Sequence, residues 1–265
     1  MPAPRTKTPP TSSALTQRAI AFERDCMAAA CDGVEEVPLG VWHRCSTQPK
    51  MWMLNQLHVL GPRPDLTADA LVAELDRGLA DVAHRRAQLD DDATGRRLAG
   101  AMRKAGWRVG GVLVMALDGE PAAGPPGLVR EADDEAMRAL DRLLHEQDPD
   151  FPASDLDVVV EGHAHLRASV PGTRAFIATH DGADASCVTL YCDGRTGQPE
   201  DVNTVTAHRG HGLAAATVAG ASREALAAGC DLVFLVVDAE DGPVVLYASL
   251  GFRPVGRYWA FTRPA

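Results

Sequence analysis

The sequence contains no apolar run close to the roughly 20 residues that a membrane-crossing helix requires. Its first 13 residues are rich in proline, serine and threonine, and no apolar signal core follows them. We therefore expect a cytoplasmic protein that makes no contact with a membrane, with residues 1–13 as a disordered tail.

The sequence also lacks a surplus of positive charge. It has 26 lysine and arginine residues against 36 aspartate and glutamate residues, a formal net charge of −10 at pH 7. Phosphate contacts need basic side chains gathered on one face, so this balance argues against a nucleic-acid partner. The negative net charge is more compatible with a cationic small molecule as the binding partner.

Metal-binding patterns are missing as well. The six cysteines form no CxxC pair and no cysteine–histidine series with zinc spacing. The pairs His163/His165 and His208/His211 have no acidic or thiol partners in a recognisable pattern, and we interpret them as surface or loop histidines. We expect reduced thiols and no metal.

The composition that is present predicts a folded protein. Hydrophobic residues make up 46% and charged residues 23%, as in ordinary globular domains. The stretch "DGEPAAGPPG", residues 118–127, is the clearest linker, because adjacent prolines flanked by glycines continue neither a helix nor a strand. It divides the chain into a first region, 14–117, and a second region, 128–265.

Both regions mix helices and strands, which predicts an α/β (α+β) protein. In the first region we expect helices over 13–33, 65–86 and 93–106 and strands over 40–44, 51–60 and 107–117. In the second we expect a helix over 131–147, two strands within 173–195 around a His-Asp-Gly turn, a strand over 199–207 and a helix over 213–228. A strand over 231–239, a short helix over 243–250 and a final strand or pair of strands over 252–262 follow. Residues 158–167 receive no assignment.

The two regions share an internal similarity. "GWRVGGVLVMAL" from Gly106 and "GFRPVGRYWAFT" from Gly251 each have a glycine, an aromatic residue, an arginine and a glycine three residues after the arginine. Both segments follow a short helix. The pattern indicates that the two regions are distant copies of one unit.

The stretch "AHRGHGLAAAT", residues 207–217, places two glycines directly before a run of alanines. Alanine is the best helix former, so a glycine loop leads here into a helix. A helix N-terminus exposes unpaired amide groups at the positive end of its dipole and attracts phosphate. A pyrophosphate site at this loop is one hypothesis, and an ordinary flexible loop is the alternative.

Two other phosphate-binding motifs fit poorly. A dinucleotide fingerprint needs a third glycine where this sequence has Ala215, and it opens a parallel sheet. An ATP-binding P-loop needs G-K-[ST], which the sequence lacks.

The segment Arg209-x-x-Gly212-x-Ala214 resembles the acyl-coenzyme A signature [RQ]-x-x-G-x-[GA] of the GNAT superfamily of N-acetyltransferases. Further on, "LYASLGFRPVGR" from Leu246 is similar to the closing L-Y-x-x-L-G-F segment of that family. The resemblance covers about residues 128–265. It implies the GNAT fold, a central mixed and mostly antiparallel sheet flanked by helices, here in two GNAT-like halves.

The resemblance also implies acetyl-coenzyme A as the co-substrate. Its pyrophosphate would contact the backbone amides of Arg209, Gly210, His211, Gly212, Leu213 and Ala214. Its pantetheine arm and acetyl carbonyl would meet the end of the preceding strand at Thr204, Val205 and Thr206, with Val205 as the best single choice. Tyr247 matches the tyrosine that protonates the departing thiolate, and a core aromatic residue is its alternative role.

Acetyl transfer to an amine also needs a base that keeps the nucleophile neutral. Glu200 and Asp201 lie on the strand before the glycine loop and are expected to point to opposite faces. We prefer Glu200 as the base and leave open Asp201 and the reading of both as solvated charges. His180 in the hairpin turn is a weaker candidate.

The first region lacks these features. The internal similarity places Met102 where the second region has Tyr247, and "GPRPDL" stands where the glycine loop should be. We therefore expect a degenerate first half and an active second half that acetylates a primary amine of a small molecule or protein. A non-catalytic acyl-coenzyme A sensor is the alternative function, and homodimerisation is left open.

Overall fold

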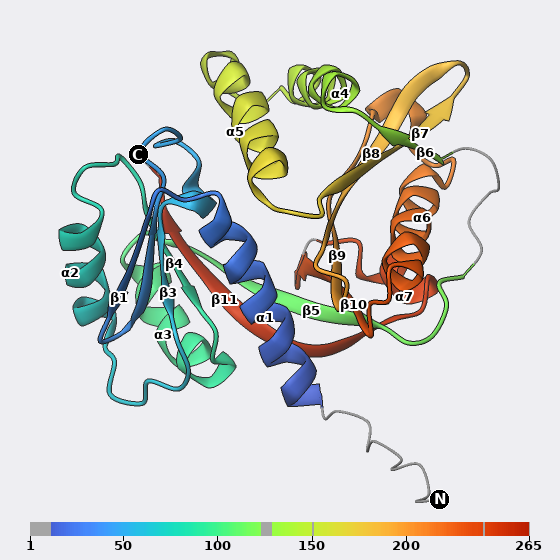
Figure 1. Cartoon of the computed structure of the whole chain (residues 1–265). Coiled ribbons are helices and arrows are strands. Elements are labelled where there is room, and N and C mark those ends of the chain that lie inside the picture. Colours follow the sequence, from blue (N-terminus) through green and yellow to red (C-terminus); the bar gives the residue numbers. More distant parts are fainter. Residues whose placement is uncertain (1–11, 123–128, 150, 241, 265) are drawn as a thin grey trace, which may run out of the picture.

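The computed structural model describes residues 12–122, 129–149, 151–240 and 242–264. Within them, one sheet has the strand order β1-β2-β3-β4-β11-β5-β10-β9-β8-β7-β6. The pairs β3–β4 and β9–β10 are parallel and the other neighbours are antiparallel. The expected mixed, mostly antiparallel sheet flanked by helices is confirmed (Figure 1).

The strands are β1 (Gly33–Val37), β2 (Gly40–Arg44), β3 (Gln56–Val59), β4 (Arg85–Leu89), β5 (Arg108–Leu117), β6 (Val129–Ala132), β7 (Arg174–His180), β8 (Ala183–Cys192), β9 (Thr196–Thr204), β10 (Leu232–Asp238) and β11 (Phe252–Arg263). The α-helices are α1 (Ser12–Ala29), α2 (Ala68–Gly78), α3 (Asp92–Lys104), α4 (Asp134–Glu146), α5 (Leu156–Ser169), α6 (Leu213–Ala227) and α7 (Val244–Ser249). Short 3-10 turns are η1 (Trp52–Leu54), η2 (Ala153–Asp155) and η3 (Thr206–His208). None of the described helices is long and apolar enough to cross a membrane.

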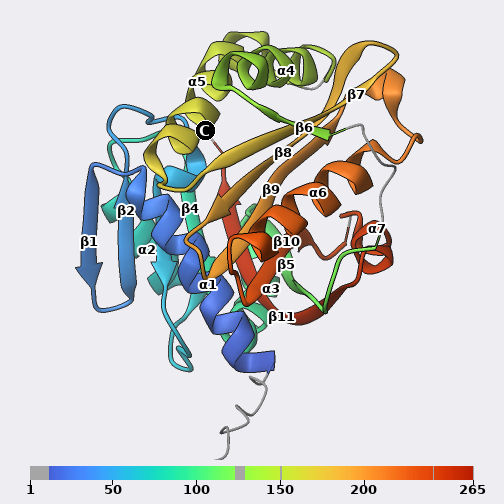
Figure 2. The same cartoon turned by 45° about the vertical axis from the view of Figure 1, so that its right-hand side comes forward.

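Helices cover both faces of the sheet. Helices α2 and α3 pack on one face of the first half, and α6 and α7 pack on the same face of the second half. The opposite face carries α1 at the junction of the halves and α4 and α5 beyond it (Figure 2). Side-chain alternation explains this arrangement, because Phe176 and Val188 face α6 while Ile177 and Cys187 face α4.

The sequence-based elements are wrong in several places. The helix expected over 65–86 ends at Gly78, and Arg85–Leu89 forms β4. Alternation accounts for this strand, since Ala87 and Leu89 are buried in the core under α2 and α3. The strand expected over 51–60 begins only at Gln56, after the turn η1. Strands β1 and β6 were not expected from the sequence, and α5 covers the residues 158–167 that received no assignment.

Each half contributes its last strand to the other half. Strand β11 pairs with β4 of the first half, and β5 pairs with β10 of the second half. The two exchanged strands also pair with each other and run side by side across the junction (Figure 1). The segments joined by the internal similarity are thus direct neighbours in the sheet.

The exchange makes each core depend on both halves. Trp259 and Phe261 of β11 belong to the core under α2 and α3, and Met115 of β5 belongs to the core under α6. The Trp259 Nε1 also donates to the Asp92 carboxylate of α3 at 2.8 Å. The linker expected over 118–127 is described only to residue 122, where Asp118 and Ala122 donate to the carbonyls of Gly251 and Leu250. The division at the linker stays a prediction.

Two glycines of α3 test the contribution of β11 to the first half. A Cβ on Gly95 would lie 2.2 Å from the Trp259 indole, whereas a Cβ on Gly100 would meet nothing within 4 Å. We expect Gly95→Ala to lower the free energy of unfolding by about 1–3 kcal/mol through overpacking. The control Gly100→Ala should raise it by roughly 0.5–1 kcal/mol. Chemical denaturation measures both, and equal effects of the two changes would contradict the contact.

Candidate functional site

The parallel strands β9 and β10 separate soon after they meet. They pair only through Leu232 with Thr196 and Val233 with Gly197, yet β9 continues to Thr204 and β10 to Asp238. The corresponding strands of the first half stay together. There β3 and β4 pair to their last residues, and the Asp90 amide still donates to the Val59 carbonyl. Only the second half therefore has a gap between its parallel strands.

The glycine loop closes this gap at the N-terminus of α6. Gly210 and Gly212 have positive φ angles of 84° and 74°, which side chains disfavour. Gly212 is the N-cap of α6 and offers no side-chain cap, whereas Thr67 caps α2 by accepting from the Ala70 amide. The first-turn amides of α6, from Leu213 onward, therefore remain free for an anion among the described residues.

The residues before the loop are more constrained. The Val205 amide donates to the Ala185 carbonyl at 2.8 Å, and the Thr206 amide donates to Gln147 Oε1 at 2.8 Å. The Thr204 carbonyl accepts from the Arg209 guanidinium at 3.3 Å. Val205 is our first choice for a ligand contact, but its amide donates to Ala185 and its carbonyl accepts from the His208 amide, so both backbone groups already have partners within the protein.

Loop residues differ in what they expose. Arg209, Gly210, His211 and Gly212 are exposed and Ala214 is half-buried. The Leu213 side chain is buried against Ala178 and Ala185 and fixes the start of the helix on the sheet. The loop therefore exposes the backbone of its two glycines together with the side chains of Arg209 and His211.

Tyr247 lies on α7, in the core under α6. It packs edge-on against Phe252, with ring centroids 6.3 Å apart. Burial, followed by the charge of Glu200, raises the pKa of Tyr247 to about 12. In the described part of the chain no hydrogen bond holds its hydroxyl group. Its counterpart Met102 is fully buried in the first-half core and has no proton to give.

Glu200 lies deep beside the gap but keeps some contact with solvent. Its carboxylate accepts from Gln198 Nε2 at 2.9 Å. Burial raises the pKa of Glu200 well above its usual value, and the charges of Asp201 and Glu23 add to this shift. A carboxylate with a raised pKa is a better proton acceptor near neutral pH.

Asp201 sits on an irregularity of β9. Its φ angle is 55°, and the β8–β9 register shifts between Cys187 and Thr189. This bulge interrupts the simple alternation on which the expected opposite orientations of Glu200 and Asp201 depended. The Asp201 charge is felt on the α4 side, where burial together with Asp141 and Asp201 raises the pKa of Cys187.

The sequence analysis missed Glu23 of α1. The Tyr258 hydroxyl of β11 donates to Glu23 Oε1 at 3.0 Å. Burial raises the pKa of Glu23 to about 7, against the hydrogen bond from Tyr258 and the charge of Arg86. Glu23 shares a helix face with buried Ala19, Ile20 and Cys26, and a carboxylate on the buried face of a helix was the available signal.

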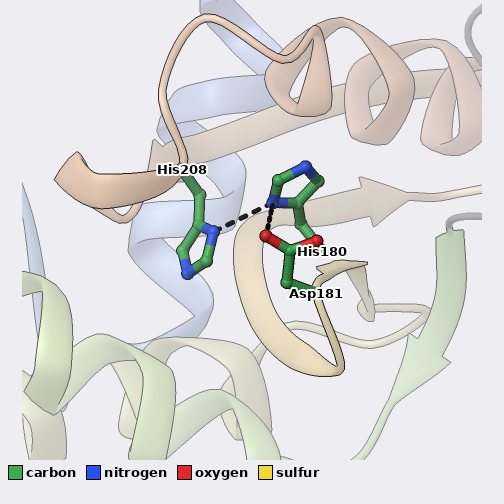
Figure 3. A group of neighbouring side chains, drawn as sticks. All are labelled: His180, Asp181 and His208. Carbon is green, nitrogen blue, oxygen red and sulfur yellow. Dashed lines mark hydrogen bonds and ion pairs between the residues drawn. The ribbon is translucent and has the colours of Figure 1, made fainter.

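His180, the weaker candidate for the base, lies away from Glu200 and Glu23. Its Nδ1 is 3.0 Å from the Nδ1 of His208 and 3.4 Å from the Asp181 carboxylate (Figure 3). The His211 ring lies 4.3 Å from the His180 ring, and its Nδ1 is 3.2 Å from the His208 carbonyl. These histidines gather at the loop before α6.

Comparisons with solved structures identify the architecture. A conserved protein of unknown function from Staphylococcus epidermidis superposes with a TM-score of 0.68 at 12% identity, over 87% of this chain and 92% of that one. A GCN5-related N-acetyltransferase from Kribbella flavida gives a TM-score of 0.58 at 17% identity, over 92% and 96% of the two chains. A tandem GNAT protein from the clavulanic acid biosynthesis pathway gives 0.53 at 16% identity, over 97% of both. The chain has the tandem GNAT fold.

These similarities concern the fold alone. No protein-family model matches the sequence, and no curated protein does. Within this GNAT fold, the parallel strands of the second half separate before an α6 without a side-chain cap, whereas in the first half the corresponding strands stay paired and Thr67 caps α2.

The raised pKa of Glu23, which lies between the two halves, can be tested through the pH dependence of stability. Glu23 ionises at about 7 in the folded protein against 4.5 ordinarily, so its ionisation costs stability as pH rises through this interval. We expect wild type and Glu23→Gln to be similarly stable at about pH 4, below the ordinary pKa of the carboxyl group. Above pH 7 the variant should be more stable by at most about 3 kcal/mol.

Denaturation at several pH values measures this difference. Glu36 on β1 is exposed, so the variant Glu36→Gln serves as the control. It should leave the pH dependence of the unfolding free energy as in the wild type. Parallel curves for wild type and Glu23→Gln would show that burial does not perturb this carboxyl group.

Proposed function

We propose that the second half binds acetyl-coenzyme A and transfers the acetyl group to a primary amine of a small molecule or protein by direct attack. The single observation that carries this proposal is the separation of β9 from β10 beside the uncapped N-terminus of α6. The GNAT fold of the N-acetyltransferases among the structural neighbours supports it.

The donor would be held mainly by backbone groups. The amides of residues 210–214 would donate hydrogen bonds to the pyrophosphate, with the positive end of the α6 dipole favouring its charge. The Arg209 amide already donates to the Thr206 carbonyl at 3.3 Å, so Arg209 would contribute its side chain. The pantetheine arm would extend along the free edge of β9 toward Thr204–Thr206. Because the Val205 amide is committed to Ala185, an earlier group on that edge would meet the acetyl carbonyl.

The acid and base would lie on opposite sides of the reacting carbon. Glu200 takes a proton from the ammonium group, and the neutral nitrogen then forms a bond to the thioester carbon. The carbon–sulfur bond breaks, and Tyr247 gives its proton to the coenzyme A thiolate. The second proton of the nitrogen passes to the tyrosinate and restores Tyr247, and Glu200 releases its proton to solvent. A tyrosine pKa of about 12 means that the hydroxyl group carries its proton at neutral pH.

Two measurements test the proposal directly. Calorimetry should show one acetyl-coenzyme A bound per chain. Release of free thiol should then identify an acceptor among polyamines, aminoglycosides, amino acids and peptides. Binding without turnover on every amine would support the sensor instead, and absence of binding would exclude both functions.

Replacing Tyr247 separates chemistry from binding. We expect Tyr247→Phe to lower kcat by about 10²-fold, because the thiolate loses its proton donor while the ring still fills the core. Donor affinity from calorimetry should change little. Tyr191→Phe, which removes a buried hydroxyl group that has no hydrogen-bond partner among the described residues, is the comparison and should keep kcat near wild type. An unchanged kcat in Tyr247→Phe would remove its role as the acid.

Replacing Glu200 tests the base through pH. The carboxylate accepts a proton only when ionised, so kcat/KM should fall as pH drops through its raised pKa. We expect Glu200→Gln to lower kcat/KM by about 10²-fold at high pH and to lose this dependence. With one acceptor for both proteins, the ratio of the profiles cancels the ionisation of the amine.

The control for this experiment removes an exposed charge. Glu146→Gln on α4 should keep the wild-type profile. A constant ratio between wild type and Glu200→Gln at all pH values would assign Glu200 a structural role and leave Asp201 as the remaining carboxylate.

A further inference from the structure

We propose that His180, Asp181 and His208 bind a divalent transition-metal ion of the zinc class, at the point where the β7–β8 hairpin meets the loop before α6. The site goes beyond the proposed acetyl transfer and departs from the metal-free protein expected from the sequence. Its ligands are the two facing imidazole nitrogens and one carboxylate oxygen (Figure 3).

The distances suit such an ion. The two Nδ1 atoms are 3.0 Å apart, and His180 Nδ1 is 3.4 Å from the Asp181 carboxylate. The ligand atoms of all three residues lie within 4.8 Å of one another. Zinc bonds of about 2.0–2.1 Å to nitrogen and oxygen place tetrahedral ligands ~3.3 Å apart. The pair of rings therefore needs to move by only a few tenths of an ångström to hold the ion.

The hairpin turn explains how neighbouring residues converge. Adjacent side chains of a strand normally point to opposite faces. Here Asp181 and Gly182 have positive φ angles of 53° and 79°, the combination of a two-residue type I′ turn. His180 ends β7 and pairs with Ala183, so the carboxylate of Asp181 folds back toward its neighbour's ring.

His208 is held in place from the other side. It ends the turn η3, and its amide donates to the Val205 carbonyl at 2.9 Å. The His211 ring contacts His180, and its Nδ1 lies near the His208 carbonyl. Both metal-binding rings are thus positioned by protein contacts, as the shell around a metal site usually positions its ligands.

The contact between the His180 and His208 rings places two nitrogen atoms where one metal ion could bind both. Two imidazole Nδ1 atoms at 3.0 Å need one proton between them, since one nitrogen must donate and the other accept. A divalent ion replaces this proton and takes a lone pair from each ring, and the Asp181 carboxylate offsets its charge. Three protein ligands leave a fourth position for water or another anion.

The ion would join two segments that lie 28 residues apart in the sequence. One carries the β7–β8 turn, and the other leads directly into residues 209–214. Binding would pin the hairpin to the glycine loop. In the described part of the chain no other set of three histidine, cysteine or acidic side chains converges in this way.

Titration of the full chain after chelator treatment tests the site without acetyl-coenzyme A. We expect one Zn²⁺ per chain by calorimetry and one Co²⁺ with a visible spectrum that lacks a thiolate charge-transfer band. His180→Ala and His208→Ala should each weaken binding by about 100-fold, and Asp181→Asn by about tenfold. Hydrogen exchange at residues 178–184 and 206–211 should slow when the ion binds.

Matched controls separate this site from other histidines, carboxylates and thiols. His145→Ala on α4, Asp184→Asn in the same hairpin and Cys230→Ser should bind the ion as the wild type does. Absence of binding, or equal binding by a His180→Ala/His208→Ala double variant, would overturn the proposal. Since no donor or acceptor is present, either result leaves the proposed acetyl transfer to be judged by its own experiments.

Discussion

Backbone hydrogen bonding between β9 and β10 is the constraint on which the candidate site depends. Two residue pairs join the strands, and beyond them each strand continues without the other. The unpaired backbone groups need other partners, because buried amides and carbonyls are costly to leave unsatisfied. An extended ligand can supply those partners, and the uncapped end of α6 stands where its anionic end would lie.

The first half shows what happens when this constraint is relieved. Its parallel strands pair to their ends, Thr67 caps its helix, and Met102 fills the core where the second half has a tyrosine. The first half is a structural scaffold that contributes β5, α1 and Glu23 to the junction.

The exchanged strands tie this scaffold to the candidate site. Strand β11 brings Tyr258 to Glu23 and Trp259 to α3, and the Glu23 charge in turn contributes to the raised pKa of Glu200. The electrostatic state of the proposed base is therefore set partly by the other half. A second half separated from the first would lack both a central strand and this carboxylate.

The sequence by itself determined the local features. Its glycines and alanines located the start of α6, the Asp-Gly pair located the β7–β8 turn, and two motifs pointed to the GNAT fold, because each depends on residues close together in the chain. Tertiary structure alone decided the exchange of β5 and β11, the bulge at Asp201 and the meeting of His180 with His208. Those features arise from strand pairing and burial between distant segments, which leave no periodic signal in the sequence. The same reason explains why β4 was taken for helix: its short, charged sequence becomes a strand only between β3 and β11.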